Sequence, residues 1–424
     1  MTAAILGYGE SGRAVAAYLD RQKLSYVVYE REAGLSALRE ACPWLTLRPM
    51  GAPILEEVIY RSPGIRPDIP PILEATQRGS RLTSEVETFC ERCPAPIYGV
   101  TGSDGKTTTA TIAAALLRAT GKRVFLGGNI GNALLPDLEN IRKEDAVVLE
   151  LSSFQLMTFH CEVEAGVVTN VTDNHLNWHR DRREYRLAKS RLLALAKHPV
   201  RNATLTDFPG RSFSATVKNA NFYLQNGTLY RGDIPLCREE DIPLKGLHQI
   251  ENLLAAIALT GVGDREVRLA LPSLRPIPHR NQYIGEFAQV MCYDSSIDTT
   301  PSRTAVTLKT HTRPLTLIAG GRGKGVPLLP LVEGILSGVD CVVFTGEMGE
   351  EMLEELRSHP AYWGIPQAWY IPDFERAVWE AHRFTPKGGT LLLSPGATSF
   401  DCFSSYKARG EAFLNILQDK TKKI

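Results

Sequence analysis

Two glycine-rich segments of this 424-residue chain have the residue types and spacing of phosphate-binding loops. The first is Gly7-x-Gly9-x-x-Gly12, which follows a short apolar run and opens a stretch with helical spacing. Glycines in this pattern allow a tight turn and let a diphosphate approach the N-terminus of a helix. Glu30 ends the next apolar run, where an acidic residue meets a ribose in such folds. Alone, this segment fits a NAD-dependent dehydrogenase or a tight turn without a ligand.

The second segment, residues 101–108, reads Thr-Gly-Ser-Asp-Gly-Lys-Thr-Thr between a predicted strand and a predicted helix. Backbone N–H groups of such a loop surround phosphates, a lysine reaches the β- and γ-phosphates, and the next hydroxyl binds Mg²⁺. Val100 stands where the strict P-loop pattern has glycine, so the loop is a variant. The predicted ATP contacts here are Gly102, Ser103, Asp104, Gly105, Lys106, Thr107 and Thr108. Two phosphate loops favour a kinase or ligase that couples ATP to a nucleotide-linked substrate.

Alternating strands and helices must position these loops. We predict strands at 3–6, 26–29, 58–60, 97–100, 146–151, 165–169, 290–293, 315–319, 341–344 and 390–394, and helices at 12–20, 83–92, 107–120, 182–196 and 249–260. Asn226-Gly227 predicts a hairpin among short strands at 203–232. Prolines near 94–96 and 272–278 predict domain boundaries. The expected α/β architecture has three domains: 1–93 (Rossmann-like), 94–276 (a P-loop-type ATPase with a mainly parallel sheet) and 277–424 (Rossmann-like).

Composition narrows the class of protein further. Lys plus Arg is 48 and Asp plus Glu is 47, so no overall positive charge indicates nucleic acid or an acidic membrane as a partner. Hydrophobic residues make up 43% of the chain, which excludes disorder as its main property. We expect a cytoplasmic protein, because no signal peptide or apolar run of transmembrane length is evident and eight scattered cysteines suit reduced thiols. Cys90 and Cys93 are expected to be thiols near a helix end, not a zinc or redox site.

Further motifs resemble those of the Mur ligase family. They are Ser62-Pro-Gly64-Ile, Gly128-Asn129-Ile-Gly131, Glu150-Leu-Ser152-Ser-Phe-Gln155-Leu, Asn170-Val-Thr-Asp-Asn-His175, Tyr185-Arg-Leu-Ala-Lys189, Gly246-Leu-His248 with Asn252, His279-Arg280, Asp294-Ser295 and the stretch 393–401. Together with the ATP loop, they span the chain from residue 5 to about 410. The 128–131 and 150–156 stretches resemble the D-glutamate-adding branch. Folylpolyglutamate synthases share the ATP loop but usually lack the N-terminal nucleotide domain.

The resemblance implies a cytoplasmic step of peptidoglycan biosynthesis. ATP phosphorylates the carboxylate of UDP-N-acetylmuramoyl-L-alanine, and the amine of D-glutamate attacks the resulting acyl phosphate. It also implies a protein that binds neither nucleic acid nor membrane and is a monomer. The alternatives are a sibling ligase or paralogue that takes another amino acid, and a paralogue that binds nucleotides without catalysis.

The resemblance also assigns residues. Catalytic roles fall to Lys106, Glu150, His175 and Lys189, and Mg²⁺, expected as two ions, would be held by Thr107, Glu150, His175 and a carbamate on Lys189. Asn252, Arg280 and Asp294 would complete the ATP site. The UDP substrate would meet Gly7, Gly9, Glu10, Ser11, Gly12, Glu30, Arg31, Ser62, Gly64, Asn129, Ser152 and Gln155. D-Glutamate would meet Lys324, Ser399, Phe400 and Tyr406.

Several of these residues also have a simpler structural interpretation, and a few positions depart from the usual sequence of the family. From sequence alone, Lys189 reads as an exposed helix lysine, His175 as a surface histidine and Asp294 as a helix N-cap. Residues 320–324 could be only a turn after a strand. Ser296 and Asp298 stand where many relatives have lysine and threonine, and Gln249 follows His248 where asparagine is usual. The lysine and threonine that would contact substrate are therefore absent at these positions, and Thr299 or Thr300 is the alternative for such a contact.

Overall fold

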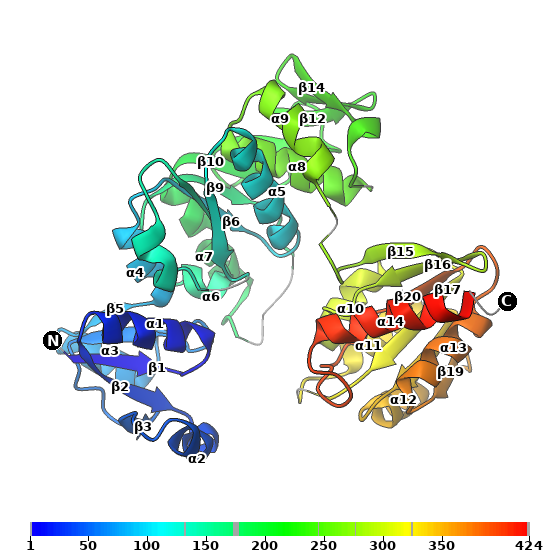
Figure 1. Cartoon of the computed structure of the whole chain (residues 1–424), viewed down its shortest axis with the longest axis horizontal. Helices are drawn as coiled ribbons and strands as arrows, with labels where there is room; N and C mark the ends of the chain where they lie inside the picture. Colours follow the sequence, from blue (N-terminus) through cyan, green and yellow to red (C-terminus); the bar gives the residue numbers. More distant parts are fainter. Residues whose placement is uncertain are drawn as a thin grey trace. The chain divides into compact units, whose positions relative to one another are not determined.

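A computed structural model describes residues 2–130, 133–172, 178–244, 246–275, 277–323 and 325–421 (Figure 1). The chain forms two compact units, residues 1–275 and 276–424. The first unit contains two separate sheets and the second unit contains one. Most strands in all three sheets are parallel, so the predicted α/β class with three sheet-containing parts is confirmed.

The N-terminal sheet is entirely parallel, with the strand order β3-β2-β1-β4-β5. Its strands are β1 (Thr2–Leu6), β2 (Ser25–Glu30), β3 (Leu47–Pro49), β4 (Val58–Arg61) and β5 (Arg81–Thr83), and its helices are α1 (Glu10–Arg21), α2 (Glu32–Ala41), α3 (Pro70–Gln77) and α4 (Glu85–Arg92). The strand order reverses between β1 and β4, which is where Rossmann-type sheets bind ligands. The Gly7–Gly12 segment leaves β1 at this point.

The central sheet has nine strands in the order β14-β13-β12-β11-β10-β9-β6-β8-β7. They are β6 (Ile97–Thr101), β7 (Val124–Gly128), β8 (Ala146–Glu150), β9 (Val163–Val168), β10 (Ala196–Asn202), β11 (Arg211–Ser214), β12 (Phe222–Gln225), β13 (Thr228–Arg231) and β14 (Ile234–Arg238). The helices are α5 (Lys106–Ala119), α6 (Ser153–Leu156), α7 (Arg182–Ala194), α8 (Leu247–Thr260) and α9 (Asp264–Ala270), with 3₁₀ turns η1 (Leu135–Asn140), η2 (Glu239–Asp241) and η3 (Leu271–Ser273). The predicted hairpin is confirmed, because Asn226 and Gly227 join antiparallel β12 and β13 at φ values of +49° and +70°.

The second unit has a six-stranded sheet in the order β15-β16-β20-β17-β18-β19, parallel except for β15. Its strands are β15 (Gln282–Phe287), β16 (Val290–Asp294), β17 (Leu315–Gly320), β18 (Cys341–Thr345), β19 (Gln367–Tyr370) and β20 (Thr390–Leu393). Its helices are α10 (Pro301–Leu308), α11 (Leu329–Gly338), α12 (Gly349–Ser358), α13 (Phe374–Phe384) and α14 (Tyr406–Thr421).

Side chains that alternate along the strands of the second unit build a core on each face of its sheet. Leu317 and Phe344 pack with α10, α11 and α12, whereas Ile318 and Val343 pack with α13 and α14. This burial on both faces explains why β17 and β18 are apolar in the sequence apart from one threonine each. The parallel strands end together, so the loops after β16, β17 and β20 lie along one edge of the sheet.

Two predicted helices extend into neighbouring strands, so their boundaries are wrong. The helix predicted at 83–92 begins at Glu85, because Thr83 ends β5 and the Ser84 side chain accepts a hydrogen bond from Glu87 N, capping the helix. The helix predicted at 182–196 ends at Ala194, and Ala196 begins β10. The polar sequence of β10, which contains a proline, gave no strand signal.

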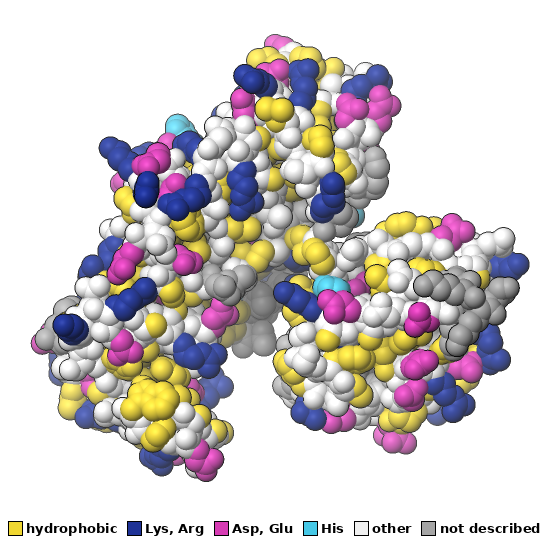
Figure 2. All heavy atoms as spheres, viewed as in Figure 1, with side chains coloured by type: hydrophobic (Ala, Val, Ile, Leu, Met, Phe, Trp, Pro, Cys, Tyr) yellow, Lys and Arg dark blue, Asp and Glu magenta, His cyan; other side chains and the backbone are white. Residues whose placement is uncertain are grey.

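On the face shown in Figure 2, basic and acidic side chains are interspersed over both units. This distribution agrees with the formal net charge of +1. No helix in the described ranges is long and apolar enough to cross a membrane. All eight cysteines are free thiols, including Cys90 on α4 and Cys93 at its end.

Glu85, at the start of α4, provides a stability prediction. Its side chain is 6% exposed and accepts a hydrogen bond from Leu135 N at 3.0 Å. Burial raises the pKa of this carboxyl from 4.5 to about 7. The folded state therefore retains the proton to higher pH than the unfolded state does, and this group destabilises the fold increasingly as pH rises from about 4.5 to 7.

We expect Glu85→Gln to raise the free energy of unfolding by roughly 2–3 kcal/mol at pH 8 and to have little effect at pH 4.5. Urea unfolding at both pH values measures the difference. Glu40→Gln, at an exposed helix position, is the control and should change neither value. An equal effect of Glu85→Gln at both pH values would contradict the assignment.

Candidate active site

The ATP loop predicted at 101–108 joins β6 to α5 and packs tightly against its neighbours. Gly102 has φ +150°, and a Cβ there would lie 1.8 Å from Thr169 Oγ1. Gly105 has φ +77°, and a Cβ there would lie 2.3 Å from Asn252 Oδ1. A side chain at either position would be strained and would clash, so both glycines are required by the loop's shape. Asn252, predicted to contact ATP, therefore lies directly against this loop.

Residues that follow β9 hold the ATP loop in place. Asp104 N donates to Asn170 Oδ1 at 2.8 Å, and Thr169 Oγ1 donates to Asp104 O at 2.6 Å. The Ser103 and Tyr185 hydroxyls lie 2.7 Å apart. Asn170 and Tyr185 belong to two of the motifs that carry the family resemblance, but neither they nor Thr169 were predicted to be site residues. The pairing of β9 with β6 was the available signal, because it brings the carboxyl ends of the two strands together.

Lys106 and Thr107 lie where the loop enters α5. Lys106 Nζ donates to the carbonyls of Gly102 at 3.0 Å and Ser103 at 2.8 Å, so the ammonium group lies over the loop. Thr107 Oγ1 donates to Glu150 Oε2 at 2.7 Å. The structure thus brings together the predicted phosphate-binding lysine and two of the predicted Mg²⁺ ligands.

Glu150 ends β8 with a side chain that is almost fully buried. Its Oε1 accepts a hydrogen bond from Asn129 Nδ2 at 2.8 Å, and its Oε2 accepts from Thr107. Asn129, predicted to contact the UDP substrate, therefore lies on the same carboxylate. The hydroxyl and carboxylate oxygens are hard ligands of the kind that Mg²⁺ prefers. His175, the third predicted ligand, lies outside the described residues.

Lys189 on α7 is buried, so its interpretation as an exposed helix lysine is wrong. Its side chain is 1% exposed, and Nζ donates to Gly102 O at 2.7 Å. Nζ also lies 4.5 Å from the centre of the Tyr185 ring. Burial, and then the positive charge of Lys106, lowers the pKa of the Lys189 ammonium well below its usual value. Among the described residues, no carboxylate forms an ion pair with it.

The N-terminal phosphate loop has the close packing that its pattern requires. A Cβ on Gly12 would lie 2.1 Å from Gly7 O, whereas Gly9 faces open space. The Glu30 carboxylate accepts hydrogen bonds from Tyr8 N and Arg31 N, both at 2.9 Å. Glu30 thus holds the loop against β2. Glu10 and Ser11 form the first turn of α1 beside this loop.

The segment after β4 lies beside the same loop. Ser62 Oγ donates to Gly7 O at 3.1 Å, and Gly64 is exposed nearby in the chain. In the central part of the unit, Ser152 and Gln155 form a capping box at α6: Gln155 N donates to Ser152 Oγ at 3.2 Å and Ser152 N donates to Gln155 Oε1 at 2.8 Å. Their contacts with substrate remain predictions, as do the roles of all the site residues.

Arg61 connects these two segments, and sequence analysis missed it. The side chain is 2% exposed. Nη1 donates to Ile65 O at 2.7 Å, and Nη2 donates to Phe154 O at 3.0 Å. Burial lowers the pKa of this guanidinium to about 10. Arg61 therefore joins the segment after β4 to α6. Its place at the end of an apolar strand gave no sign of this role.

In the second unit, Asp294 ends β16 and is buried. Its Oδ2 lies 2.7 Å from His279 Nδ1, and its Oδ1 accepts from Ser296 N at 2.8 Å. Its interpretation as a helix N-cap is wrong, because α10 begins at Pro301. The contributions of Asp294 and Arg280 to the ATP site remain predictions.

The departure at Asp298 has a structural explanation. Its Oδ2 accepts hydrogen bonds from Ser295 Oγ at 2.6 Å, Thr307 Oγ1 at 2.7 Å and Ser394 Oγ at 2.9 Å. With 4% of its surface exposed, Asp298 ties the loop after β16 to α10 and to the end of β20. Ser394 opens the stretch that leads to Ser399, so Asp298 supports a predicted D-glutamate loop without facing solvent.

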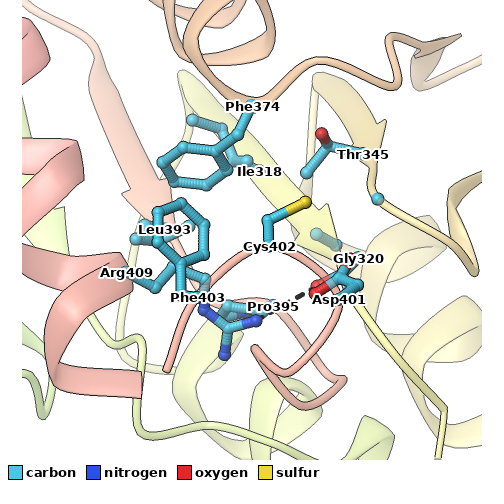
Figure 3. A pocket seen from close by; sticks show the side chains of 13 residues that line it. Ile318, Gly320, Thr345, Phe374, Leu393, Pro395, Asp401, Cys402, Phe403 and Arg409 are labelled. Carbon is cyan, nitrogen blue, oxygen red and sulfur yellow. Dashed lines mark hydrogen bonds between the residues drawn. The ribbon is translucent and has the colours of Figure 1, made fainter. Parts of the chain in front are cut away.

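The predicted D-glutamate residues lie on loops at the carboxyl edge of the second sheet. Ser399 is 1% exposed, Phe400 is 62% exposed and Tyr406 begins α14. Arg322 and Thr398 exchange backbone hydrogen bonds at 2.9 Å, so the loops after β17 and β20 are adjacent. Lys324 lies outside the described residues. A small pocket lies beside these loops, between Phe374, Phe403, Asp401 and Arg409 (Figure 3).

Comparisons with known proteins agree with this arrangement. Residues 100–260 match the Mur ligase middle domain. UDP-N-acetylmuramoylalanine–D-glutamate ligases of Clostridium novyi and Clostridium kluyveri are 35% and 36% identical to the chain, each over 86% of it and 83% of the relative.

Solved structures share the fold. UDP-N-acetylmuramate-alanine ligase MurC from Thermotoga maritima has a TM-score of 0.58 at 19% identity, covering 99% of this chain and 100% of that one. MurF ligase from Thermotoga maritima in complex with ADP has a TM-score of 0.54 at 16% identity, covering 99% and 95%. Because the two Clostridium ligases are more than a third identical to this chain over most of both sequences, the chain belongs to the UDP-N-acetylmuramoylalanine–D-glutamate ligase family of Mur ligases.

Proposed function

We propose that the protein joins D-glutamate to the alanyl carboxylate of UDP-N-acetylmuramoyl-L-alanine at the expense of ATP. The observation that carries this proposal is the convergence of Lys106, Thr107, Glu150 and Lys189 on one loop. The identity to ligases of this name over most of the chain supports the choice of substrates.

The chemistry follows from the weak reactivity of a carboxylate. Transfer of the γ-phosphoryl group forms an acyl phosphate, the amine of D-glutamate attacks its carbonyl, and phosphate leaves as the amide forms. Lys106 neutralises charge on the transferring phosphoryl group, and loop N–H groups orient the phosphates. No protein nucleophile is needed, so this chain's contribution is to position the groups and to stabilise charge.

Mg²⁺ fits the oxygen atoms gathered at the ATP loop. Thr107 and Glu150 would hold it, with His175 and a modified Lys189 as further ligands. When bound, Mg²⁺ neutralises phosphate charge and polarises the phosphoryl group. Asn129 orients the Glu150 carboxylate through its amide.

Lys189 is proposed to carry a carbamate. A neutral amine adds to CO₂, forming a C–N bond and releasing one proton. The buried position without a carboxylate partner favours the neutral amine, and the product is an anion suited to a metal site. Lys106, which also donates to Gly102 O, provides a positive charge next to that anion.

The other predicted contacts are proposed in the same roles. The uridine diphosphate is bound by residues of the Gly7 and Ser62 loops. The muramoyl-alanyl part of the substrate is contacted by Asn129, Ser152 and Gln155. D-Glutamate is contacted by Ser399, Phe400, Tyr406 and Lys324. We further propose three domains divided near residues 93 and 276, action in the cytoplasm and a monomeric state.

Phosphate release tests the proposal. Purified protein with ATP, Mg²⁺ and UDP-N-acetylmuramoyl-L-alanine should release phosphate when D-glutamate is added and not with L-glutamate. Phosphate release that depends on a different amino acid would instead indicate a sibling specificity. Release with no amino acid requirement, or none at all, would contradict ligase activity.

A further inference from the structure

Arg409 lies in the first turns of α14, one helical turn after Tyr406, with a side chain that is 2% exposed. Nη1 donates to Thr398 O at 3.1 Å and to Gly320 O at 3.4 Å. Nη2 donates to Ser296 O and to Ala397 O, both at 3.0 Å. One guanidinium therefore contacts the loops after β16 and β20 and the last residue of β17.

These four partners are all backbone carbonyls, so the arginine fixes the paths of the loops and not the side chains on them. No carboxylate of the described residues lies within ion-pair distance of Arg409. Because the guanidinium is buried, losing these contacts would leave the cation without its hydrogen-bond partners and would remove one hydrogen bond from each carbonyl. The arrangement is therefore strongly dependent on the planar fork of arginine, which a lysine cannot reproduce.

Close packing confirms how near the loops and α14 approach. A Cβ on Gly410 would lie 2.3 Å from His279 Nδ1 and 2.6 Å from Ser296 Oγ. A Cβ on Gly321 would lie 2.1 Å from Thr398 O and 3.0 Å from Arg409 Nη1. Glycine at 410 lets α14 approach the residues around the end of β16, and glycine at 321 lets the backbone after β17 approach the guanidinium. The pocket in Figure 3 has Arg409 in its wall next to Gly320 and Pro395.

We infer that Arg409 is a positioning residue for the amino-acid substrate: by holding the loops after β16, β17 and β20 together, it sets the width of the pocket that recognises the incoming amino acid. This inference rests on the proposed function, because the predicted D-glutamate residues lie on two of these loops and on α14. Arg409 itself does not contact substrate.

Arg409→Lys tests the inference, since it keeps the charge but cannot span four carbonyls. We expect the KM for D-glutamate to rise at least about tenfold, while the KM values for ATP and UDP-N-acetylmuramoyl-L-alanine stay within about twofold. Arg409→Gln, which is neutral, should show the same selective rise in the KM for D-glutamate. It replaces Arg409→Lys as the test if the lysine variant does not fold.

Phe413→Leu is the matched control. Phe413 is fully buried on the same helix, in the core that α13 and α14 form on one face of the sheet, and its side chain cannot hydrogen-bond the four carbonyls that Arg409 holds. This variant should lower Tm without a selective change in the KM for D-glutamate. If Arg409→Lys behaved like Phe413→Leu, or raised all three KM values equally, Arg409 would be only a stabilising residue and the inference would be overturned.

Hydrogen–deuterium exchange separates this inference from the proposed function, because it needs no substrate. In Arg409→Lys, backbone amides at 296–298, 320–323 and 396–400 should all exchange at least about tenfold faster than in the wild type. Phe413→Leu should not change these three loops together. Unchanged exchange in the loops would exclude the positioning role, even if the wild type used a different amino acid.

Discussion

Lys106→Met is expected to lower the rate of phosphate release by about 10³-fold, because a methionine of similar length cannot neutralise the phosphoryl group as it is transferred. The Lys106 ammonium donates to the Gly102 and Ser103 carbonyls, so it lies over the loop that we propose holds the phosphates. A coupled assay of ADP formation at saturating substrate concentrations measures the same turnover, because each cycle forms one ADP and one phosphate.

Lys122→Met is the control for this variant, because Lys122 is exposed in the turn after α5 and should leave the rate unchanged. Far-UV circular dichroism and thermal unfolding would show that Lys106→Met remains folded. A rate within about tenfold of the wild type would contradict the assignment of residues 101–108 as the ATP loop.

Lys189→Arg is expected to lower turnover by about 10²-fold or more, since arginine keeps the positive charge but cannot form a carbamate. Wild-type turnover should fall when bicarbonate and CO₂ are removed and recover when they are returned. With ¹³C-bicarbonate, the wild type should give a carbamate ¹³C NMR signal that Lys189→Arg lacks.

Lys197→Arg is the matched control, because Lys197 is exposed and pairs with Glu164 on the surface. It should leave both turnover and the ¹³C signal unchanged. Near-normal turnover of Lys189→Arg would contradict the carbamate. Loss of turnover without any bicarbonate dependence or ¹³C signal in the wild type would indicate that Lys189 acts only as a buried amine.

Local patterns predicted the glycine loops and the strands that carry them. Gly102 and Gly105 could be identified from the sequence because a phosphate-binding loop is a short continuous motif. The structure shows that a side chain would clash at both positions. The parallel sheet then placed Glu150 beside Thr107, as expected for adjacent strand ends. Resemblance, and not spacing, singled out Lys189, whose burial no helical pattern revealed.

Arg61 and Arg409 show what a single sequence does not reveal. Each is a charged residue in a segment that otherwise predicts a simple strand or helix, and each is buried by contacts with residues far along the chain. Their partners are mostly carbonyl groups, which carry no sequence signature. The role of Asp298 was hidden because only the fold brings its hydroxyl partners, Thr307 on α10 and Ser394 after β20, to its carboxylate.

The most direct test of the ligase uses UDP-N-acetylmuramoyl-L-alanine labelled with ¹⁸O in both oxygens of its alanyl carboxylate. With ATP, Mg²⁺ and D-glutamate, mass spectrometry should show the amide product, one ¹⁸O retained in its new carbonyl, and one ¹⁸O in each phosphate released. This result follows if the carboxylate attacks the γ-phosphoryl group and the amine then displaces phosphate. Phosphate without ¹⁸O, or ATP consumption without the D-glutamyl product, would contradict the account.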